Sequence, residues 1–274
     1  MSSLKEILRK YRAFPIKRLG QNFLLDKKVL KKIVKSAELS KKEIVVEIGP
    51  GIGNLTKELA KKAKKVIAIE KDKRMVEILK KELKNLDNVE IIEGDAREKI
   101  EEIAKKIGKN YKIVANIPYY LTSFLIRKIL ELKNKPKLIV LMVQKEVAQR
   151  ICAKPPKMNL LAVSVQFFSK AKIISFVPKN CFWPRPKVDS AILEIQPKEQ
   201  LPLRNLEVFF KIVKKGFSHK RKQLINNLAK GLGIEKSKVR RWLLKSQIDP
   251  KKRAEQLKIE DWINLANFYE KKFK

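Results

Sequence analysis

The chain has 274 residues, enough for one large domain or for a large and a small one, and 44% of them are apolar, as in an ordinary packed core. Lysine and arginine total 65 against 29 acidic residues, a formal charge of +36, so we expect a polyanion as partner, with nucleic acid favoured over an anionic membrane surface. Two cysteines without metal-ligand spacing and a single histidine argue against a metal site, a disulfide framework and a His-dependent nucleophile.

A second explanation of the charge is a lysine-rich surface that serves solubility or a high growth temperature. Thermal adaptation normally raises glutamate together with lysine, and here the acidic residues fall far behind. The N-terminus is charged and lacks the apolar core of a signal peptide, and no apolar run approaches the ~20 residues of a membrane span. We therefore expect a cytoplasmic protein that does not associate with membranes.

Residues 1–19 form a basic, partly amphipathic lead-in to the stretch Gly20-Gln21-Asn22-Phe23-Leu24. On turn propensities alone, this stretch is an ordinary connection to the helix that follows. Apolar residues recur with helical spacing over residues 29–37, and Asp26 stands where an N-cap is expected.

Residues 44–63 have the pattern of a strand, a tight glycine turn and a helix. Residues 44–48 are rich in β-branched side chains, glycines stand at positions 49, 51 and 53, and helical spacing of apolar residues follows over 55–63. Asn54 or Thr56 could cap that helix. Strand, glycine turn and helix form the nucleotide-binding start of a doubly wound sheet, so the predicted fold class is α/β.

Three further predicted strands each end in a polar residue. Strands at 66–69, 89–92 and 112–115 lead to Glu70, Asp95 and Asn116. Glu70 follows the glycines by about twenty residues, where this architecture places an acid on ribose hydroxyls. Open α/β sheets bind ligands at the edge where their strands end, so these three side chains are expected to share one site.

The stretch Asn116-Ile117-Pro118-Tyr119 is predicted to be the catalytic loop. Pro118 disfavours helix at the residue before it, so the strand stops abruptly. One amide, stiffly held backbone carbonyls and one ring emerge there, and they suit a flat heterocycle that carries an amino group. Asn and Pro are also ordinary turn residues, so a plain strand-to-turn junction is the alternative.

The remaining apolar runs, residues 138–143, 160–168 and 191–195, are expected to complete the sheet. Pro197 and Pro202 bracket a polar stretch, so we place a domain boundary between residues 198 and 199. Residues 1–198 then form the α/β domain, and residues 199–274 form a smaller all-helical domain.

The helical domain is predicted to bind RNA through basic residues that contact phosphates, although any one of them could instead lie on a solvated helix face. These residues are Lys220, Arg221, Lys222, Arg240 and Arg241. Folded RNA is recognised largely by its shape, which a set of phosphate contacts can read.

The glycine spacing in Glu47-Ile48-Gly49-Pro50-Gly51-Ile52-Gly53 resembles motif I of S-adenosylmethionine-dependent methyltransferases, because a dinucleotide site usually has its third glycine one position later. Four stretches together resemble the ribosomal-RNA adenine N6-dimethyltransferase family, in the small-subunit branch whose loss gives kasugamycin resistance. They are Gly20-Gln21-Asn22-Phe23-Leu24, Glu47-Ile48-Gly49-Pro50-Gly51, Asn116-Ile117-Pro118-Tyr119 and Phe182-Trp183-Pro184-Arg185-Pro186-Lys187-Val188-Asp189-Ser190. Residues 217–228 resemble the C-terminal domain of the same branch.

The resemblance implies a Rossmann-like methyltransferase sheet that uses S-adenosylmethionine. It also implies N6,N6-dimethylation of two adjacent adenosines near the 3′ end of small-subunit ribosomal RNA, with a role in the biogenesis of that subunit. The expected partner is this RNA or the assembling small subunit, and we expect a monomer without a metal.

The resemblance also assigns site residues. The cofactor-binding set is Asn22, Leu24, Gly49, Gly51, Glu70, Asp95 and Asn116. The catalytic set is Asn116, Pro118, Tyr119 and Phe182, with the two rings on either side of a flipped base. Glu70 would accept from the ribose hydroxyls, and Asp95 would accept from the adenine amino group of the cofactor.

Two alternatives stay open at this point. Large-subunit ribosomal-RNA adenine N6-methyltransferases associated with macrolide resistance share the motifs of the first domain. A ribosome-assembly or transcription factor could also keep this fold without catalysis. The chain departs from the family at Tyr120, where a polar or small residue is common. This extra ring could alter base entry or the choice between mono- and dimethyl product, but we expect it to pack against the protein.

Overall fold

The computed structural model describes residues 4–203 and 205–273. Their contacts divide them into two compact units, one within residues 1–148 and 171–197, the other within residues 149–170 and 198–274. The first unit is built of strands and helices in layers, and the second is mainly helical.

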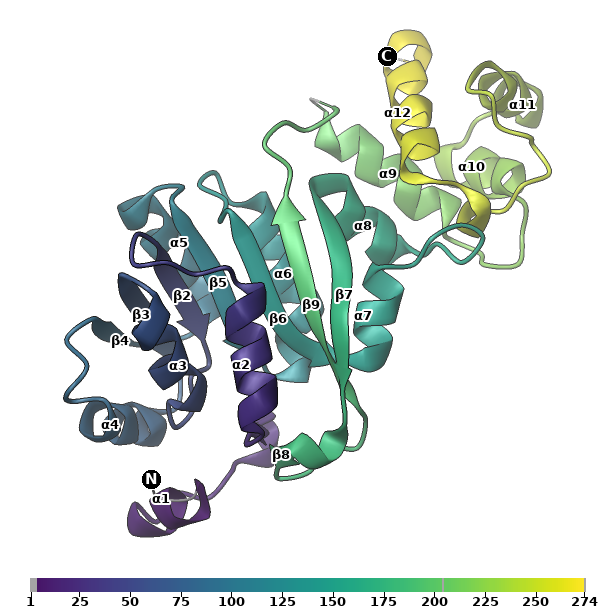
Figure 1. The fold of residues 1–274 in the computed structure, drawn as a ribbon. Coiled ribbons are helices and arrows are strands. Elements are labelled where there is room, and N and C mark those ends of the chain that lie inside the picture. The colour runs from purple at the N-terminus through teal and green to yellow at the C-terminus, as the bar shows by residue number, and fades with distance from the viewer. Residues whose placement is uncertain (1–3, 204, 274) are drawn as a thin grey trace. The chain divides into compact units, whose positions relative to one another are not determined.

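A seven-stranded sheet forms the centre of the first unit (Figure 1). The strands are β2 (Ile44–Ile48), β3 (Lys65–Glu70), β4 (Val89–Glu93), β5 (Tyr111–Asn116), β6 (Leu138–Gln144), β7 (Ser169–Val177) and β9 (Ser190–Pro197). Their order is β4-β3-β2-β5-β6-β9-β7, with the strands from β4 to β6 parallel and β9 antiparallel to β6. This order confirms the predicted doubly wound fold. From β2 the chain builds the sheet outward through β3 and β4, and with β5 it returns to the other side of β2, so the strand order reverses between β2 and β5.

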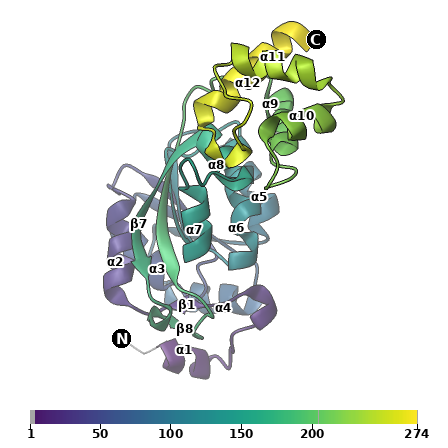
Figure 2. The same ribbon diagram turned by 90° about the vertical axis from the view of Figure 1, so that its right-hand side faces the viewer.

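Helices cover both faces of this sheet, as a parallel sheet requires. The helices of the first unit are α1 (Leu4–Lys10), α2 (Lys27–Ser36), α3 (Asn54–Lys62), α4 (Lys73–Glu82), α5 (Ala96–Ile107) and α6 (Thr122–Glu131), and α7 (Lys145–Ile151) starts within it. Helices α2 and α3 lie on one face, and α5 and α6 lie on the other (Figures 1 and 2). The central residues of the strands between them are therefore buried, and Val45, Ile113 and Val114 expose no surface.

Of the two predicted helix caps, the cap of α2 is confirmed and the cap of α3 is wrong. Asp26 is the N-cap of α2, since its side chain accepts from two backbone N–H groups of the first turn. The prediction that Asn54 or Thr56 caps α3 is wrong, because that helix begins directly after Gly53 without a side-chain cap. Asn54 instead donates to the carbonyl of Leu24 at 3.1 Å, so this amide serves a contact between distant segments.

The prediction of a strand at residues 160–168 is also wrong, because this run forms helix α8 (Leu160–Phe168). A short apolar run has no period that separates a buried strand from a buried helix. Asn159 decides between them, since its side chain caps the helix by accepting from the N–H of Ala162 at 3.0 Å. Residues 138–143 and 191–195 lie in β6 and β9 as predicted, and β7 was missed.

The second unit is a helical bundle that α8 joins. Its other helices are α9 (Leu206–Gly216), α10 (Leu224–Leu232), α11 (Lys236–Lys245) and α12 (Ile259–Phe273). Helix α8 packs on α9 and α12, with the rings of Phe167 and Phe209 4.2 Å apart, so residues 149–170 belong with this unit rather than with the sheet. None of the helices in the described ranges combines the length and hydrophobicity that crossing a membrane requires.

A buried lysine fastens α2 to the sheet. Lys112 on β5 is 8% exposed, and its Nζ donates to the carbonyl oxygens of Ala37 and Glu38 at 3.0 and 2.6 Å. A carboxylate oxygen of Glu43 lies 3.5 Å from the same atom. Carbonyls at a helix C-terminus lack partners within the helix and carry partial negative charge, so this ammonium stabilises the end of α2.

We predict that Lys112→Met lowers the free energy of unfolding by about 1–3 kcal/mol, because two carbonyls and a carboxylate lose a buried partner while the side-chain volume changes little. Denaturant titration followed by circular dichroism measures the change. Lys62→Met, on the exposed surface of α3, is the matched control and should cost less than about 0.5 kcal/mol. Equal effects of the two substitutions would mean that Lys112 does not anchor α2.

Candidate active site

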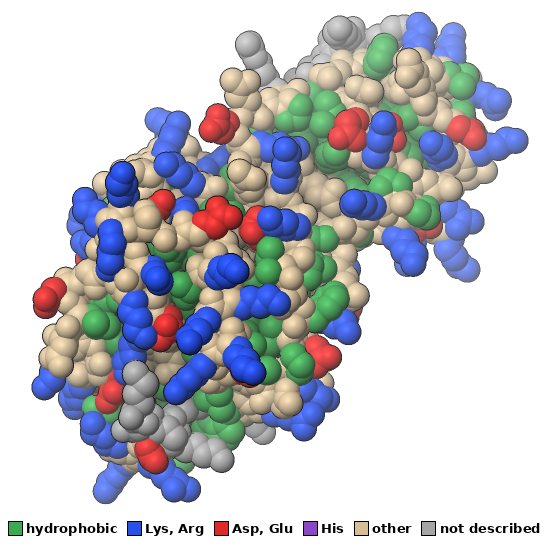
Figure 3. Space-filling model, in the orientation of Figure 1, with side chains coloured by type: hydrophobic (Ala, Val, Ile, Leu, Met, Phe, Trp, Pro, Cys, Tyr) green, Lys and Arg blue, Asp and Glu red, His purple; other side chains and the backbone are tan. Residues whose placement is uncertain are grey.

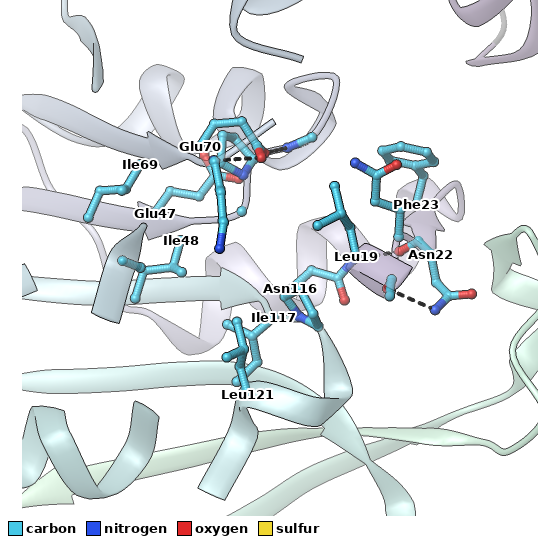
Figure 4. Close-up of a pocket in the computed structure, with 18 of the residues that line it drawn as sticks. Leu19, Asn22, Phe23, Glu47, Ile48, Ile69, Glu70, Asn116, Ile117 and Leu121 are labelled. Atoms are coloured by element: carbon cyan, nitrogen blue, oxygen red, sulfur yellow. Dashed lines mark hydrogen bonds between the residues drawn. The ribbon is translucent and has the colours of Figure 1, made fainter. Parts of the chain in front are cut away.

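A pocket opens at the carboxyl ends of β2, β3 and β5, where the strand order reverses (Figure 4). Its walls come from the segment of residues 19–24, the glycine loop after β2, and the ends of β3, β4 and β5 with the loops that follow them. The predicted site residues that line it are Asn22, Leu24, Gly49, Gly51, Glu70, Asp95, Asn116, Pro118 and Tyr119. One pocket therefore gathers the proposed cofactor residues and most of the proposed catalytic loop.

The amide of Asn116 has a fixed orientation. Its Nδ2 donates to the carbonyl oxygen of Asn22 at 3.0 Å, and Figure 4 shows the side chain beside Leu19 and Asn22. Only the nitrogen of an amide can donate, so this bond leaves Oδ1 as the atom that can accept from a ligand. The side chain of Asn22 donates in turn to the carbonyl of Gly20 at 3.1 Å.

The ring of Tyr119 is also held in place. Its hydroxyl lies 2.8 Å from the hydroxyl of Ser190, which is fully buried at the start of β9. Burial raises the pKa of Tyr119, and the hydrogen bond to Ser190 opposes the shift in part. Ser190 thus positions Tyr119. The sequence alone assigned it no role, although Ser190 is the last residue of the stretch from Phe182 that resembles the family.

Phe182 does not line the pocket in the described structure. It is 3% exposed and lies in strand β8 (Phe182–Trp183), which pairs with β1 (Phe23–Leu24) so that Phe182 stands opposite Leu24. Its side chain belongs to the hydrophobic core formed by α2, α3 and the sheet. A ring in this place can stack on a base only after it is exposed, so the predicted sandwich stays a prediction.

The N-terminal segment is tied across the pocket by Gln21. Its Oε1 accepts from the N–H of Ile16 at 2.8 Å, and its Nε2 donates to a carboxylate oxygen of Asp72 at 2.8 Å. Asp72 is in addition paired with Arg74 at 2.6 Å, and these bonds hold the pKa of Asp72 below its usual range although burial opposes them. Gln21 was visible in the sequence only as part of a turn.

Glu70 ends β3 with a carboxylate that three backbone N–H groups hold. Its Oε1 accepts from Lys71 and Asp72 at 2.8 and 2.9 Å, and its Oε2 accepts from Gly51 at 3.1 Å. The residue is 7% exposed, and burial raises its pKa against the opposing effect of these hydrogen bonds. The bonds fix the direction of the carboxylate, and Oε2 keeps room for a further donor.

Asp95 is engaged by two cations rather than standing open. Its oxygens accept from Arg97 Nη2 at 2.6 Å and from Lys71 Nζ at 2.9 Å. The Arg97 guanidinium holds the pKa of Asp95 well below its usual range. Because the carboxylate is ionised and already partnered, a ligand that reaches it must share or displace these bonds.

Glu47 is a buried carboxyl that sequence reasoning treated only as part of a motif. It lies on β2, between two neighbouring strands, is 1% exposed and lines the pocket (Figure 4). Its Oε2 has no hydrogen-bond partner among the described residues. Burial raises the pKa of Glu47 to about 8, and the neighbouring carboxylate of Glu70 adds to the shift.

The expectation that Tyr120 packs against the protein is wrong. The residue is 59% exposed and lines the pocket at its rim. It belongs to the 3₁₀ turn Tyr119–Leu121 that leads into α6, and this turn directs consecutive side chains to different sides. Tyr119 is therefore held by Ser190 while Tyr120 faces solvent.

The predicted RNA-binding residues all lie on the surface of the helical unit. Lys220, Arg221 and Lys222 are exposed in the connection between α9 and α10, and Arg240 and Arg241 are exposed on α11. Figure 3 shows basic side chains over much of the drawn face, with fewer acidic ones among them. Contact of these five residues with phosphates stays a prediction.

A family described as ribosomal RNA adenine dimethylase matches residues 16–271 of the chain. A ribosomal RNA small subunit methyltransferase A from Dehalococcoides mccartyi is 43% identical over 274 residues, covering 98% of this chain and 93% of the relative. A protein of the same name from Clostridium botulinum is 42% identical over 268 residues, covering 96% of this chain and 97% of the relative.

Solved structures give the same picture. A dimethyladenosine transferase from Plasmodium falciparum has a TM-score of 0.78 and 31% sequence identity, covering 92% of this chain and 98% of the other. The 23S rRNA methyltransferase ErmE has a TM-score of 0.73 and 25% identity, covering 90% of this chain and 99% of the other. Most of this chain thus shares its fold with a dimethyladenosine transferase and with a 23S rRNA methyltransferase.

We predict that Gly51→Ala weakens both the fold and the pocket. Gly51 has a φ of +59°, and an added methyl group would lie 2.8 Å from the ring of Phe23, which packs the N-terminal segment against Ile52 and α4. The substitution should cost about 2–4 kcal/mol, more than the ~1 kcal/mol expected for the backbone conformation alone. Thermal unfolding and adenosyl-ligand affinity are the measurements.

Gly233→Ala separates the two causes. Gly233 is also left-handed, with a φ of +68° and a ψ of 31°, but a methyl group there meets nothing within 4 Å. This control should lose only the backbone term and keep full ligand affinity. Matching losses in the two variants would refute the steric role of Gly51.

Proposed function

Because the chain belongs to the ribosomal RNA adenine dimethylase family, we propose that it dimethylates N6 of adenosines in small-subunit ribosomal RNA with S-adenosylmethionine as the methyl donor. The names of its relatives support the small-subunit branch. The observation that carries the chemistry is the bond from Asn116 Nδ2 to Asn22, which leaves Oδ1 free to accept from an amino group.

The pocket suits an adenosyl compound with a charged methionine end. The buried Glu47 carboxyl, whose Oε2 lacks a partner among the described residues, would hold the α-ammonium group. Gly49 and Gly51, both at positive φ, let the ligand approach the backbone closely. Glu70 would accept from the ribose hydroxyls and Asp95 from the adenine amino group, while Asn22 and Leu24 close the N-terminal side.

Adenine N6 is a weak nucleophile because its lone pair is delocalised into the ring, and Asn116 would make this nitrogen more reactive. When bound, S-adenosylmethionine supplies an electrophilic methyl group, so the chain needs no nucleophile of its own. Asn116 Oδ1 and a backbone carbonyl would accept the two N6 hydrogens, which favours a tetrahedral nitrogen with a localised lone pair. The Pro118 carbonyl already accepts from Leu121 at 3.0 Å, so Ile117 is the better second acceptor.

The proposed base-binding role belongs to Tyr119 first. The bond to Ser190 fixes its ring before the substrate arrives, which lowers the entropy lost on stacking. Phe182 would supply the second face after it leaves the core. We further propose that the helical unit contacts RNA phosphates through Lys220, Arg221 and Lys222, together with the arginines of α11, and that the protein acts as a monomer on the assembling subunit.

Incubation of the protein and methyl-labelled S-adenosylmethionine with under-methylated small ribosomal subunits, and in parallel with unmethylated large-subunit RNA, followed by nucleoside analysis of both RNAs, tests the function. N6,N6-dimethyladenosine confined to the small-subunit RNA is the expected result. Label in large-subunit RNA would move the assignment to the macrolide-resistance type, and bound cofactor without any transfer would favour a non-catalytic assembly factor.

We predict that Asn116→Ala lowers kcat by about 10²–10³-fold, because the acceptor of one N6 hydrogen is lost where charge develops. The affinity for RNA, measured by filter binding, should change little, since phosphate contacts supply most of it. Asn134→Ala is the matched control, as Asn134 donates to the carbonyl of Ala104 away from the pocket. An unchanged turnover of the Asn116 variant contradicts the proposed amine contact.

We predict that cofactor binding near pH 7 releases a proton from Glu47. With its pKa raised to about 8, this carboxyl is mostly protonated in the free protein, and an ammonium partner would ionise it. Release should therefore be largest below pH 8 and disappear above it, where the free protein has already lost the proton. Calorimetry in buffers of different ionisation enthalpy measures it.

Glu47→Gln keeps the size of the side chain and removes the titration. Its binding heat should no longer depend on the buffer in this way, and its affinity for the cofactor should fall. The same proton release in the wild type and in this variant would assign the effect to another group.

A further inference from the structure

Two exposed aromatic rings follow the catalytic loop, one helical turn apart. Tyr120 is 59% exposed and Phe124 is 54% exposed. Tyr120 stands in the 3₁₀ turn and Phe124 in the first turn of α6, and a spacing of four residues places them on the same side of this continuous stretch. Neither ring stacks on another aromatic ring in the part of the chain that the structure describes.

The position of Tyr120 is defined although its surface is open. An added methyl group at Gly20 would lie 3.4 Å from Cδ1 of its ring and 3.3 Å from Cβ of Pro118. One edge of the ring thus lies beside Gly20 of the N-terminal segment, at the rim of the pocket, while most of its surface remains in water. A side chain placed in this way costs little entropy when a flat ligand covers it.

Positive charge lies beside this rim. Arg97 and Lys71 are held on Asp95, with 44% and 54% of their side chains exposed, and Arg97 is within electrostatic range of Tyr120. Further along α6, Arg127 is 55% exposed and paired with Glu131. An aromatic face with neighbouring cations fits a base with its phosphate, and it does not fit an extended apolar protein surface.

We propose that Tyr120 stacks on the nucleotide adjoining the target adenosine, and that Phe124 extends this platform by one base. The inference rests on the proposed function. A base that flips into the pocket leaves its neighbour without a stacking partner, and a ring at the rim replaces the lost contact. Where the adjoining nucleotide is itself a target adenosine, Tyr120 would hold it in register beside the first.

The test compares Tyr120→Ala with Tyr120→Phe on small subunits reconstituted with a ligated synthetic 3′ RNA segment. Three RNAs are used: one intact, one abasic on the 5′ side of the target, and one abasic on the 3′ side. On intact RNA, Tyr120→Ala should raise KM by about 5- to 100-fold with kcat nearly unchanged, while the phenylalanine variant stays within about threefold of the wild type.

The abasic RNAs distinguish stacking from a structural role. The penalty of Tyr120→Ala should vanish on the RNA that lacks the stacked base, because the wild type then has nothing to lose there. A penalty of equal size on all three RNAs, or none on intact RNA while the wild type methylates it, overturns the inference. Failure of the wild type to methylate any RNA overturns the proposed function instead.

Phe176→Ala serves as the matched control. Phe176 is 50% exposed on β7, does not line the pocket and lies under the ammonium of Lys145. Its loss should leave KM unchanged on all three RNAs, and a matching rise in KM would show that any exposed ring has the same effect. Affinity for S-adenosylhomocysteine, measured for each variant, should equal that of the wild type and reports that the pocket is intact.

Discussion

The hydrogen bond between Asn116 and the carbonyl of Asn22 joins segments that lie 94 positions apart, and the site depends on it. It brings the end of β5 against the N-terminal segment, so the amide proposed to be catalytic is oriented by the same residues that close the pocket. Gln21 fastens this segment by donating to Asp72, and Asn54 at the start of α3 fastens it by donating to the carbonyl of Leu24. The amide and the pocket wall are therefore set together.

This closure is possible because the backbone passes close to itself at glycines. Gly20, Gly49 and Gly51 all have positive φ, and Pro118 and the ring of Phe23 lie where side chains would otherwise project. A sheet edge alone offers a crevice that is open on one side. The residues after Leu19 turn this crevice into a pocket with polar groups on opposite walls.

The strands and the acids at their ends were predictable because each β-branched run stops at a glycine, an acid or an amide, and the ends of parallel strands share one edge. The pairing of distant side chains was not. Ser190 lies 71 positions from Tyr119, and nothing local in the sequence connects the two hydroxyls. The prediction of a strand at Leu160–Phe168 failed for a different reason. Its apolar residues fit the period of a buried strand and that of a buried helix, and only the N-cap residue Asn159 indicated a helix.

The charges of this molecule suit two proposed ligands of opposite charge. A protein of +36 attracts RNA and repels a cofactor that is itself cationic, yet Glu47, Glu70 and Asp95 gather in one pocket. Screening over about 8 Å lets their local field differ from that of the surface. Asp95 lies where the acidic pocket meets the basic surface, because Arg97 and Lys71 donate to its carboxylate oxygens at the rim. In the proposed complex, an amino group that binds Asp95 shares or displaces these contacts, and cations released from Asp95 can then bind a phosphate.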